Sequence, residues 1–398
     1  MTKKITGMQC ALILCITTIG LNFLVFPALF AKYAFSDVYI SVAIGLAIDF
    51  LFCALVLSIM KHNPNVTLQQ LISRVFGSVV AKILIFLLAV HLFCKGILII
   101  KEIHNYFNET LFDDINWFVY VVPLLILIGY MTLKDFRVFG RTIQFFVWLI
   151  ALALVVSVVI PASQSDFSNL LPFFENGVTG VFEGLFRCSF TFGDYLILFL
   201  LMGKVEFKPN TSKTVLTWLV VTDIFVIGFY VVFSAVFGDT GLNHSLALSE
   251  LLLYTSINTL NGSINWLNIL FWLIILFLQV GIVMLSSAKL IGECFNIKSK
   301  IITMFIIVVG VLVSVALLYL NLIRAINIIT SLPFIIADLS FQAVLLIVVV
   351  VSAIKCNKNK TKLTEVFTHK LIKYELTQIN GVVIKHQYKS RKGGDVNA

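Results

Sequence analysis

The chain has 398 residues, of which 60% are hydrophobic and 12% are charged, and its mean hydropathy is +1.02. Soluble domains carry about twice that share of charge, and one aqueous core could not bury so much apolar surface. The composition therefore excludes a soluble globular protein and predicts a polytopic membrane protein. The net charge of +9 is explained by loop topology and a basic tail, so no nucleic-acid partner is expected.

Apolar segments long enough to cross a bilayer recur along the whole chain. Windows of about 19 residues predict ten spans, at residues 8–31, 38–60, 79–101, 116–133, 142–161, 178–203, 214–237, 264–292, 300–320 and 325–354. Lys3 and Lys4 precede the first run as in a signal peptide. That run is too long and lacks a small-residue cleavage site, so we expect it to be retained as a helix.

Basic residues gather in alternate loops. The loops on the N-terminal side hold fourteen Lys and Arg residues, and the opposite loops hold only Lys32, Lys101 and Arg324. This bias places both termini in the cytoplasm. The predicted parts are a cytoplasmic N-terminus (1–7), a ten-helix transmembrane domain (8–354) and a basic cytoplasmic tail (355–398). The tail is either a solvated extension or a segment attracted to anionic lipid headgroups.

The ten spans divide into two halves of five, residues 8–161 and 178–354, which must have opposite topology. Inverted repeats of this kind place a binding site at the midplane, in helices that break there. The first span of each half carries polar residues and a glycine at its middle: Thr17, Thr18, Gly20 and Asn22 in one, and Ser189, Thr191, Gly193 and Asp194 in the other.

Either glycine alone would suit close packing between helices, whereas the coincidence favours two broken helices. A broken helix offers free N–H groups to a carboxylate and free carbonyls to an ammonium or small cation. Both charges occur on a zwitterionic amino acid. We therefore expect Gly20 and Asn22 to let the first helix open around a ligand.

Ionisable groups at membrane depth are costly, so each is a functional candidate. Asp194, beside the expected break, would hold a ligand ammonium, stay protonated, or act as the structural partner of a nearby base. Lys95 and His91 lie four residues apart on one face of span three, which indicates a polar cavity wall.

Three further acids are open to more than one interpretation. Asp49 and Asp223 are single acids in spans two and seven, and either could pair with Lys95 or Arg187. Asp338 follows Pro333, which should kink span ten, and is either structural or part of a proton relay.

Several stretches resemble one known family in their order and spacing. They are "IGLNFLVFP", "FSDVYISVAIG", "HNPNVTLQQLISRVFGSVVAKIL", "NLLPFFENGVTGVFEGLFRCSFTFGDYLIL" and "INWLNILFWLIILFLQVGIVMLSSAKLIGECF". Together they look like the B subunits of bacterial spore germinant receptors, the GerAB family, over about residues 5–354. Two departures are Asp194, where Glu is more usual, and the longer basic tail.

The resemblance implies the all-α, LeuT-like fold of amino acid–polyamine–organocation transporters, with ten helices in a 5+5 inverted repeat and helices one and six broken. It also implies the inner membrane of spores, recognition of a small germinant that is often an amino acid, and an A subunit and a lipoprotein C subunit as partners. An amino acid/cation symporter with the same fold is the alternative function, and a channel is a third.

The predicted ligand-binding residues are Thr18, Gly20, Leu21, Asn22, Phe23, Lys95, Ser189, Phe190, Thr191, Phe192, Gly193 and Asp194. In sodium-coupled members of this fold, hydroxyls at the position of Ser286 and Ser287 hold an ion, although a Ser-Ser pair also suits helix packing. The seven cysteines form no CxxC motif and are expected to be packing residues. No cofactor or metal is expected, and no GxSxG, Walker or HExxH motif suggests an enzyme.

Overall fold

Helices follow one another almost without interruption in the computed structural model, which describes residues 4–110, 117–174, 177–254, 263–319 and 322–357. Its α-helices are α1 (Gly7–Asn22), α2 (Phe26–Ala34), α3 (Val38–His62), α4 (Leu68–Phe76), α5 (Ser78–Thr110), α6 (Trp117–Thr132), α7 (Phe136–Ala162), α8 (Gly177–Arg187), α9 (Tyr195–Leu201), α10 (Thr211–Phe237), α11 (Ala247–Tyr254), α12 (Ser263–Cys294), α13 (Lys300–Tyr319), α14 (Leu322–Ile329) and a C-terminal helix, Leu332–Asn357. Short 3-10 turns are η1 (Phe35–Asp37), η2 (Phe167–Leu170), η3 (Ser189–Thr191) and η4 (Gly238–Asn243).

The start of α1 is fixed by local and long-range hydrogen bonds. Thr6 Oγ1 accepts from the Gln9 N–H at 3.3 Å while Gln9 Oε1 accepts from the Thr6 N–H at 3.2 Å, which is a capping box. Just before it, the Ile5 N–H donates to the Lys204 carbonyl at 2.9 Å, and the Glu206 N–H donates to the Ile5 carbonyl at 2.8 Å. These bonds fasten the beginning of α1 to the segment that follows α9.

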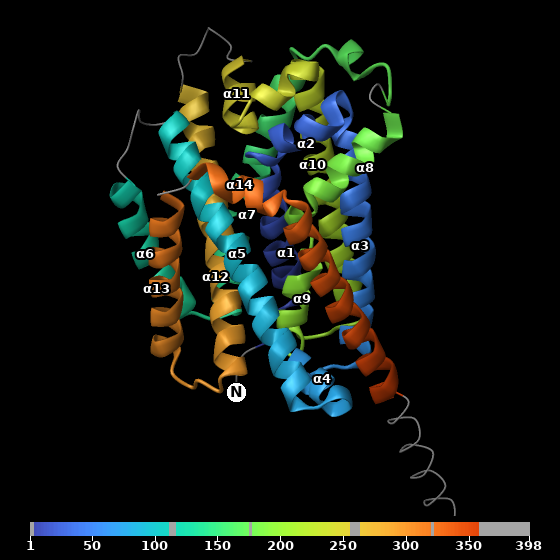
Figure 1. Cartoon of the computed structure of the whole chain (residues 1–398), viewed down its shortest axis with the longest axis vertical. Coiled ribbons are helices and arrows are strands. Elements are labelled where there is room, and N and C mark those ends of the chain that lie inside the picture. The colour runs from blue at the N-terminus through green and yellow to red at the C-terminus, as the bar shows by residue number, and fades with distance from the viewer. Residues whose placement is uncertain (1–3, 111–116, 175–176, 255–262, 320–321, 358–398) are drawn as a thin grey trace, which may run out of the picture.

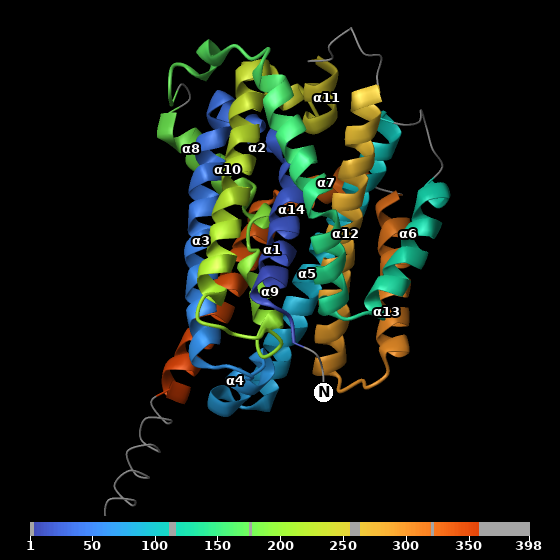
Figure 2. The ribbon, with the colours of Figure 1, turned by 180° about the vertical axis from the view of Figure 1, so that it is seen from behind.

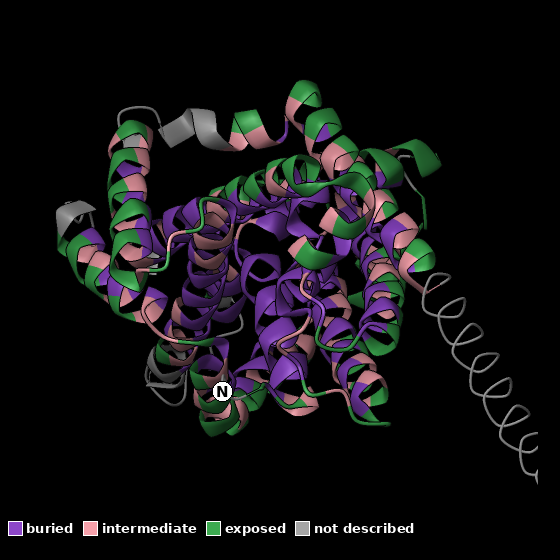
Figure 3. Ribbon diagram, turned by 90° about the horizontal axis from the view of Figure 1, so that it is seen from below, coloured by how far each residue is buried: buried purple, intermediate pink, exposed green. Residues whose placement is uncertain are grey.

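Helix α1 runs through the middle of the bundle, where it packs against α7, α10 and α12 (Figures 1 and 2). Buried residues fill the centre of the view from below and exposed ones form the rim (Figure 3). Large apolar side chains are exposed on that rim, for example Phe145 (80%) and Trp148 (82%) of α7. An apolar outer face is what a lipid environment requires, so the protein is an integral membrane protein.

Seven helical segments in the described residues are long and apolar enough to cross a membrane, or eight when α8 and α9 are taken as one bent span. One of these segments, Phe26–His62, runs from α2 through α3, while α1 and α6 are shorter apolar helices. The helices fall where the ten spans were predicted, but the count of ten and the division into two halves stay predictions.

Three predicted spans are interrupted. Span one is divided into α1 and α2 at Phe23–Val25, and span six bends by 45° between α8 and α9. Span ten is divided into α14 and the C-terminal helix at Thr330–Ser331, two residues before Pro333. The proline lies in the first turn of the new helix, where its missing N–H is not needed.

Both described ends of the chain, near Lys4 and Asn357, lie at the end of the bundle that carries α4 (Figure 1). The cytoplasmic location of this end stays a prediction. Most of the basic tail (358–398) and residues 255–262, between predicted spans seven and eight, lie outside the described residues. All seven cysteines are free, and five of them are buried, in line with a packing role.

Candidate functional site

The break in the sixth predicted span is built around Gly193. Turn η3 follows α8, Phe192 is extended, and Gly193 has φ +93°, a left-handed conformation that glycine adopts at little cost. Because α9 begins only at Tyr195, the carbonyl groups of Thr191 and Phe192 are released from regular helical hydrogen bonding. The break therefore presents backbone oxygen atoms in the interior of the bundle.

The ammonium group of Lys95 occupies this break. Lys95 projects from the middle of α5, and its side chain is 2% exposed. Its Nζ donates to the Thr191 carbonyl at 3.1 Å, to the Phe192 carbonyl at 3.3 Å and to Asp194 Oδ1 at 3.3 Å. A buried charge is stable only with such partners. The chain thus supplies its own cation at the place where an opened helix could hold one.

Asp49 of α3 binds the other side of the same break. Its Oδ1 accepts a hydrogen bond from the Gly193 N–H at 3.2 Å, and the residue is 4% exposed. The break therefore has an ammonium on its carbonyl groups and a carboxylate on a free N–H group. The sequence left open whether Asp49 or Asp223 pairs with Lys95 or Arg187, and the structure gives Asp49 a hydrogen bond from backbone.

Asn22 connects the two breaks. Its Nδ2 donates to the Thr18 carbonyl at 2.7 Å, and its Oδ1 accepts from Thr191 Oγ1 at 3.3 Å and from Tyr230 OH at 3.5 Å. The amide is 1% exposed. Asn22 thus terminates α1 and binds the segment that opens in span six.

The other predicted residues of helix one are buried around this amide. Thr18 bonds the Leu14 carbonyl of its own helix at 3.1 Å, and Leu21 is fully packed. The ring of Phe23 lies 4.2 Å from that of Phe229 and 4.7 Å from that of Trp272, measured between centroids. Phe23 therefore anchors the break in an aromatic cluster.

The prediction that Gly20 opens helix one is wrong. Gly20 lies inside α1, and the interruption comes three residues later, at Phe23. A Cβ atom at position 20 would lie 1.7 Å from Gln279 Oε1 of α12, whose Nε2 donates to the Thr17 carbonyl at 2.8 Å. Gly20 therefore makes room for the Gln279 side chain of α12, which agrees with the packing interpretation weighed from sequence more than with a break.

A chain of hydrogen bonds runs from α5 through the C-terminal helix to α9. His91 Nδ1 lies 2.7 Å from Asp338 Oδ1, and Asp338 Oδ2 accepts from Gln342 Nε2 at 2.8 Å. Gln342 Oε1 accepts from Tyr195 OH at 3.0 Å. His91 and Lys95 thus have different partners although they share a helix face. Neither Gln342 nor Tyr195 was predicted as a site residue, although a glutamine inside the last apolar span was a visible signal.

The remaining predicted residues have varied surroundings. Phe190 packs at 5.2 Å from the His91 ring and 5.4 Å from that of Phe334, measured between centroids. Ser189 is buried, and its hydroxyl finds no hydrogen-bond partner in the part of the chain that the structure describes. Ser286 Oγ donates to the Ile282 carbonyl at 2.6 Å and Ser287 Oγ donates to the Ala89 carbonyl at 2.9 Å. Ser287 therefore joins α12 to α5, whereas Ser286 bonds within its own helix, and an ion site at the pair stays a prediction.

Arg187 and Asp223 are not joined to the central charges by hydrogen bonds. Arg187 Nη1 donates to the Thr330 carbonyl at 3.1 Å, and Nη2 contacts Glu183 at 3.5 Å. Asp223 of α10 is 9% exposed, and its buried Oδ1 has no hydrogen-bond partner in the described residues. Helix rotation, which sequence alone does not fix, decides these pairings.

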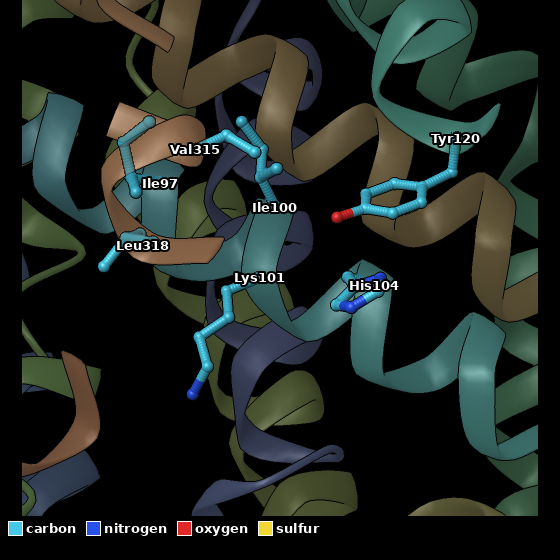
Figure 4. A pocket seen from close by; sticks show the side chains of 7 residues that line it. All are labelled: Ile97, Ile100, Lys101, His104, Tyr120, Val315 and Leu318. Atoms are coloured by element: carbon cyan, nitrogen blue, oxygen red, sulfur yellow. The ribbon is translucent and has the colours of Figure 1, made fainter. Parts of the chain in front are cut away.

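Two cavities adjoin the polar interior. One of about 390 Å³ reaches Asp49, Ser189 and Gly193 between α3, α8 and the C-terminal helix. The other, of about 20 Å³, lies between α5, α6 and α13. There the His104 ring stacks on Tyr120 with centroids 4.6 Å apart, while the Lys101 side chain points away from that ring (Figure 4). The first is large enough for an organic ligand. A third cavity in the described residues, of about 380 Å³, is of similar size, but it is lined by residues such as Phe107, Pro123 and Phe277 and not by residues of the break.

Gly193→Ala is expected to destabilise the protein by about 1–2 kcal/mol, because an L-residue at φ +93° is strained. The melting temperature of the purified protein in detergent measures this effect. Gly129→Ala is a matched control, since its Cβ would meet neighbours only at 3.6 Å or beyond. Equal melting temperatures for the two variants would contradict the assigned backbone of the break.

Solved structures of transporters share this fold. Two mutant forms of a manganese transporter from Eremococcus coleocola are 12% identical to the chain, over 85% of this chain and 78% of theirs, with a TM-score of 0.55. The same transporter in complex with an aromatic bis-isothiourea substituted compound is 13% identical over the same shares, with a TM-score of 0.53. At such low identity the likeness shows the fold alone. No curated protein matches the sequence significantly.

Residues 4–323 match the family described as spore germination protein, a permease-type family. The match covers most of the chain and agrees with the apolar helices and the transporter fold. Both the family and the structural neighbours are membrane permeases or transporters, a class distinct from enzymes. The chain therefore belongs to the spore germination protein family.

Proposed function

We propose that the chain is the membrane subunit of a spore germinant receptor, and that a small germinant binds beside the breaks of helices one and six. One observation carries the proposal: the Lys95 ammonium lies 3.1–3.3 Å from two carbonyl oxygens and one carboxylate oxygen of the broken helix. Buried charges in a membrane are costly and mark functional sites. Because the break is stabilised by a single side-chain ammonium, it can adopt two arrangements, one with Lys95 bound to it and one with Lys95 moved away.

The proposed mechanism is a population shift. A germinant that brings its own charge beside Asp49 or Asp194 changes how strongly Lys95 is held in the break. Because Asn22 joins the break of helix six to the end of α1, loss of the Lys95 contacts would release both helices together. A ligand shifts such an equilibrium only by its difference in affinity for the two states. An A subunit and a lipoprotein C subunit would respond to the shift. In this proposal both termini of the chain itself lie in the cytoplasm.

An amino acid/cation symporter is the second candidate, favoured by the fold shared with manganese transporters. The described residues contain no group of three or more His, Cys, Asp or Glu side chains that could hold a metal ion, and the proposal names no metal as cargo. Lys95 also occupies the carbonyl site that a coupling cation would need. We therefore favour a sensing function over a transport function.

Spores that lack this chain test the proposal. Their germination is followed as a fall in optical density against a panel of single amino acids, amines and sugars, with the wild-type chain restored as the control. The expected result is selective loss of the response to one compound class, recovered on complementation. Unchanged germination together with reduced amino acid uptake in growing cells would favour the symporter instead.

A further inference from the structure

The cavity of about 390 Å³ beside the helix-six break opens sideways from the bundle. Ile48 of α3 and Phe182 of α8 line it and are 42% and 54% exposed. Asp49, at its inner end, is near the middle of the 25-residue helix α3. The cavity therefore leads from the apolar flank of the protein to the break, near the middle of α3.

The inner end of this cavity has hydrogen-bonding capacity that the protein does not use. Ser189 is 9% exposed, and its hydroxyl has no hydrogen-bond partner in the described residues. The Asp49 carboxylate accepts from the Gly193 N–H, but a carboxylate has sites for about four hydrogen bonds. Tyr195 and Gln342, which also line the cavity, are already bonded to each other. A ligand would thus meet acceptors at Asp49 and Ser189.

The charges around the break do not balance. Asp49 and Asp194 are both buried at the break, and Asp223 is a third buried acid, whose Oδ1 has no hydrogen-bond partner in the described residues. Lys95 is the one ammonium bonded to this group in the described residues, since His91 contacts Asp338 and Arg187 contacts Glu183. A buried excess of negative charge favours binding of a proton or a cation.

We propose that this cavity binds a primary amine that has an apolar body and no carboxylate, with its ammonium between Asp49 and Ser189. The walls are mainly apolar and include Phe52, Phe186 and Leu339. Among the described residues no Lys, Arg or His lines the cavity, so the carboxylate of an amino acid would meet no counter-charge from them. The inference rests on the proposed function, because it names the ligand class for the same break.

Calorimetric titration of the purified full chain in lipid nanodiscs tests this inference with three probes that share a phenylethyl group and differ in their polar groups. We expect 2-phenylethylamine to bind at least about tenfold more tightly than neutral 2-phenylethanol or zwitterionic L-phenylalanine, since a charge-assisted hydrogen bond contributes about that factor. Asp49→Asn keeps an oxygen for the Gly193 N–H and should weaken amine binding by about tenfold. Equal binding of the three probes would overturn the inference.

A second pair of variants covers the case in which Asp49→Asn fails to fold. Ile48→Trp fills the cavity mouth without touching its polar end and should abolish amine binding. Leu51→Trp lies on the same helix, is 65% exposed and does not line the cavity, so it should bind as the wild type does. Amine binding that survives Ile48→Trp would also overturn the inference.

The outcome separates this inference from the proposed function. Failure of the amine to bind, with selective loss of germination in spores lacking the chain, refutes the ligand class and leaves the receptor. Amine binding with unchanged germination of those spores supports the cavity and refutes the receptor.

Discussion

Lys95→Met is expected to destabilise the protein by about 3–5 kcal/mol, the range for removing one partner of a buried ion pair. Both members of the pair are only 2% exposed, so Asp194 would be left as an uncompensated charge. The carbonyl groups of Thr191 and Phe192 would lose their donor as well. Melting temperature in detergent, together with the amount of folded protein in membranes, measures the effect.

The double variant Lys95→Met/Asp194→Asn separates charge from packing. It removes both charges, so most of the lost stability should return, because an ion pair replaced as a unit leaves no unpaired charge. Lys61→Met, an exposed residue near the end of α3, is the control and should melt as the wild type does. If Lys95→Met melted like this control, Lys95 would not be the buried cation of the break.

Gly20→Ala is expected to destabilise the protein by about 1–3 kcal/mol, the usual effect of overpacking a tight core. The added methyl group would lie 1.7 Å from Gln279 Oε1, so α12 or its side chain must move. Moving Gln279 also endangers its hydrogen bond to the Thr17 carbonyl. Melting temperatures of the purified variants give the size of the effect.

A double-mutant cycle identifies the cause. In a Gln279→Ala background the clash is absent, so Gly20→Ala should have a smaller effect there than in the wild type. Gly228→Ala in α10, where the nearest atom to the added Cβ is 3.7 Å away, should be close to neutral. An unchanged effect of Gly20→Ala in both backgrounds would mean that Gln279 is not the obstacle.

The sequence predicts where the helices break better than which residue breaks them. Polar residues inside apolar runs are costly, so their clusters mark both interruptions. Gly193 and Gly20 look alike in sequence, yet one has φ +93° and the other is helical beside Gln279. The neighbour of Gly20, Gln279, is held in place by its hydrogen bond to the Thr17 carbonyl, and these two residues are 262 positions apart in the sequence. Local sequence patterns do not encode such a contact.

Charge pairing shows the same limit. The four-residue spacing of His91 and Lys95 correctly places them on one face of a helix. It does not reveal that His91 contacts Asp338 while Lys95 contacts Asp194, because the two partners come from helices whose rotation is set by packing. Asp49 was recognised as a buried acid, but its partner, the Gly193 N–H, exists only because the helix is broken.

Germination of spores that carry the double variant Lys95→Met/Asp194→Asn tests the central claim most directly. This variant is expected to fold and to reach the membrane in wild-type amounts, so a defect would report on the break and not on stability. We predict that these spores no longer respond to the germinant that the wild-type chain recognises. A normal response, at equal protein levels, would contradict a sensing role for the helix-six break and its bound ammonium.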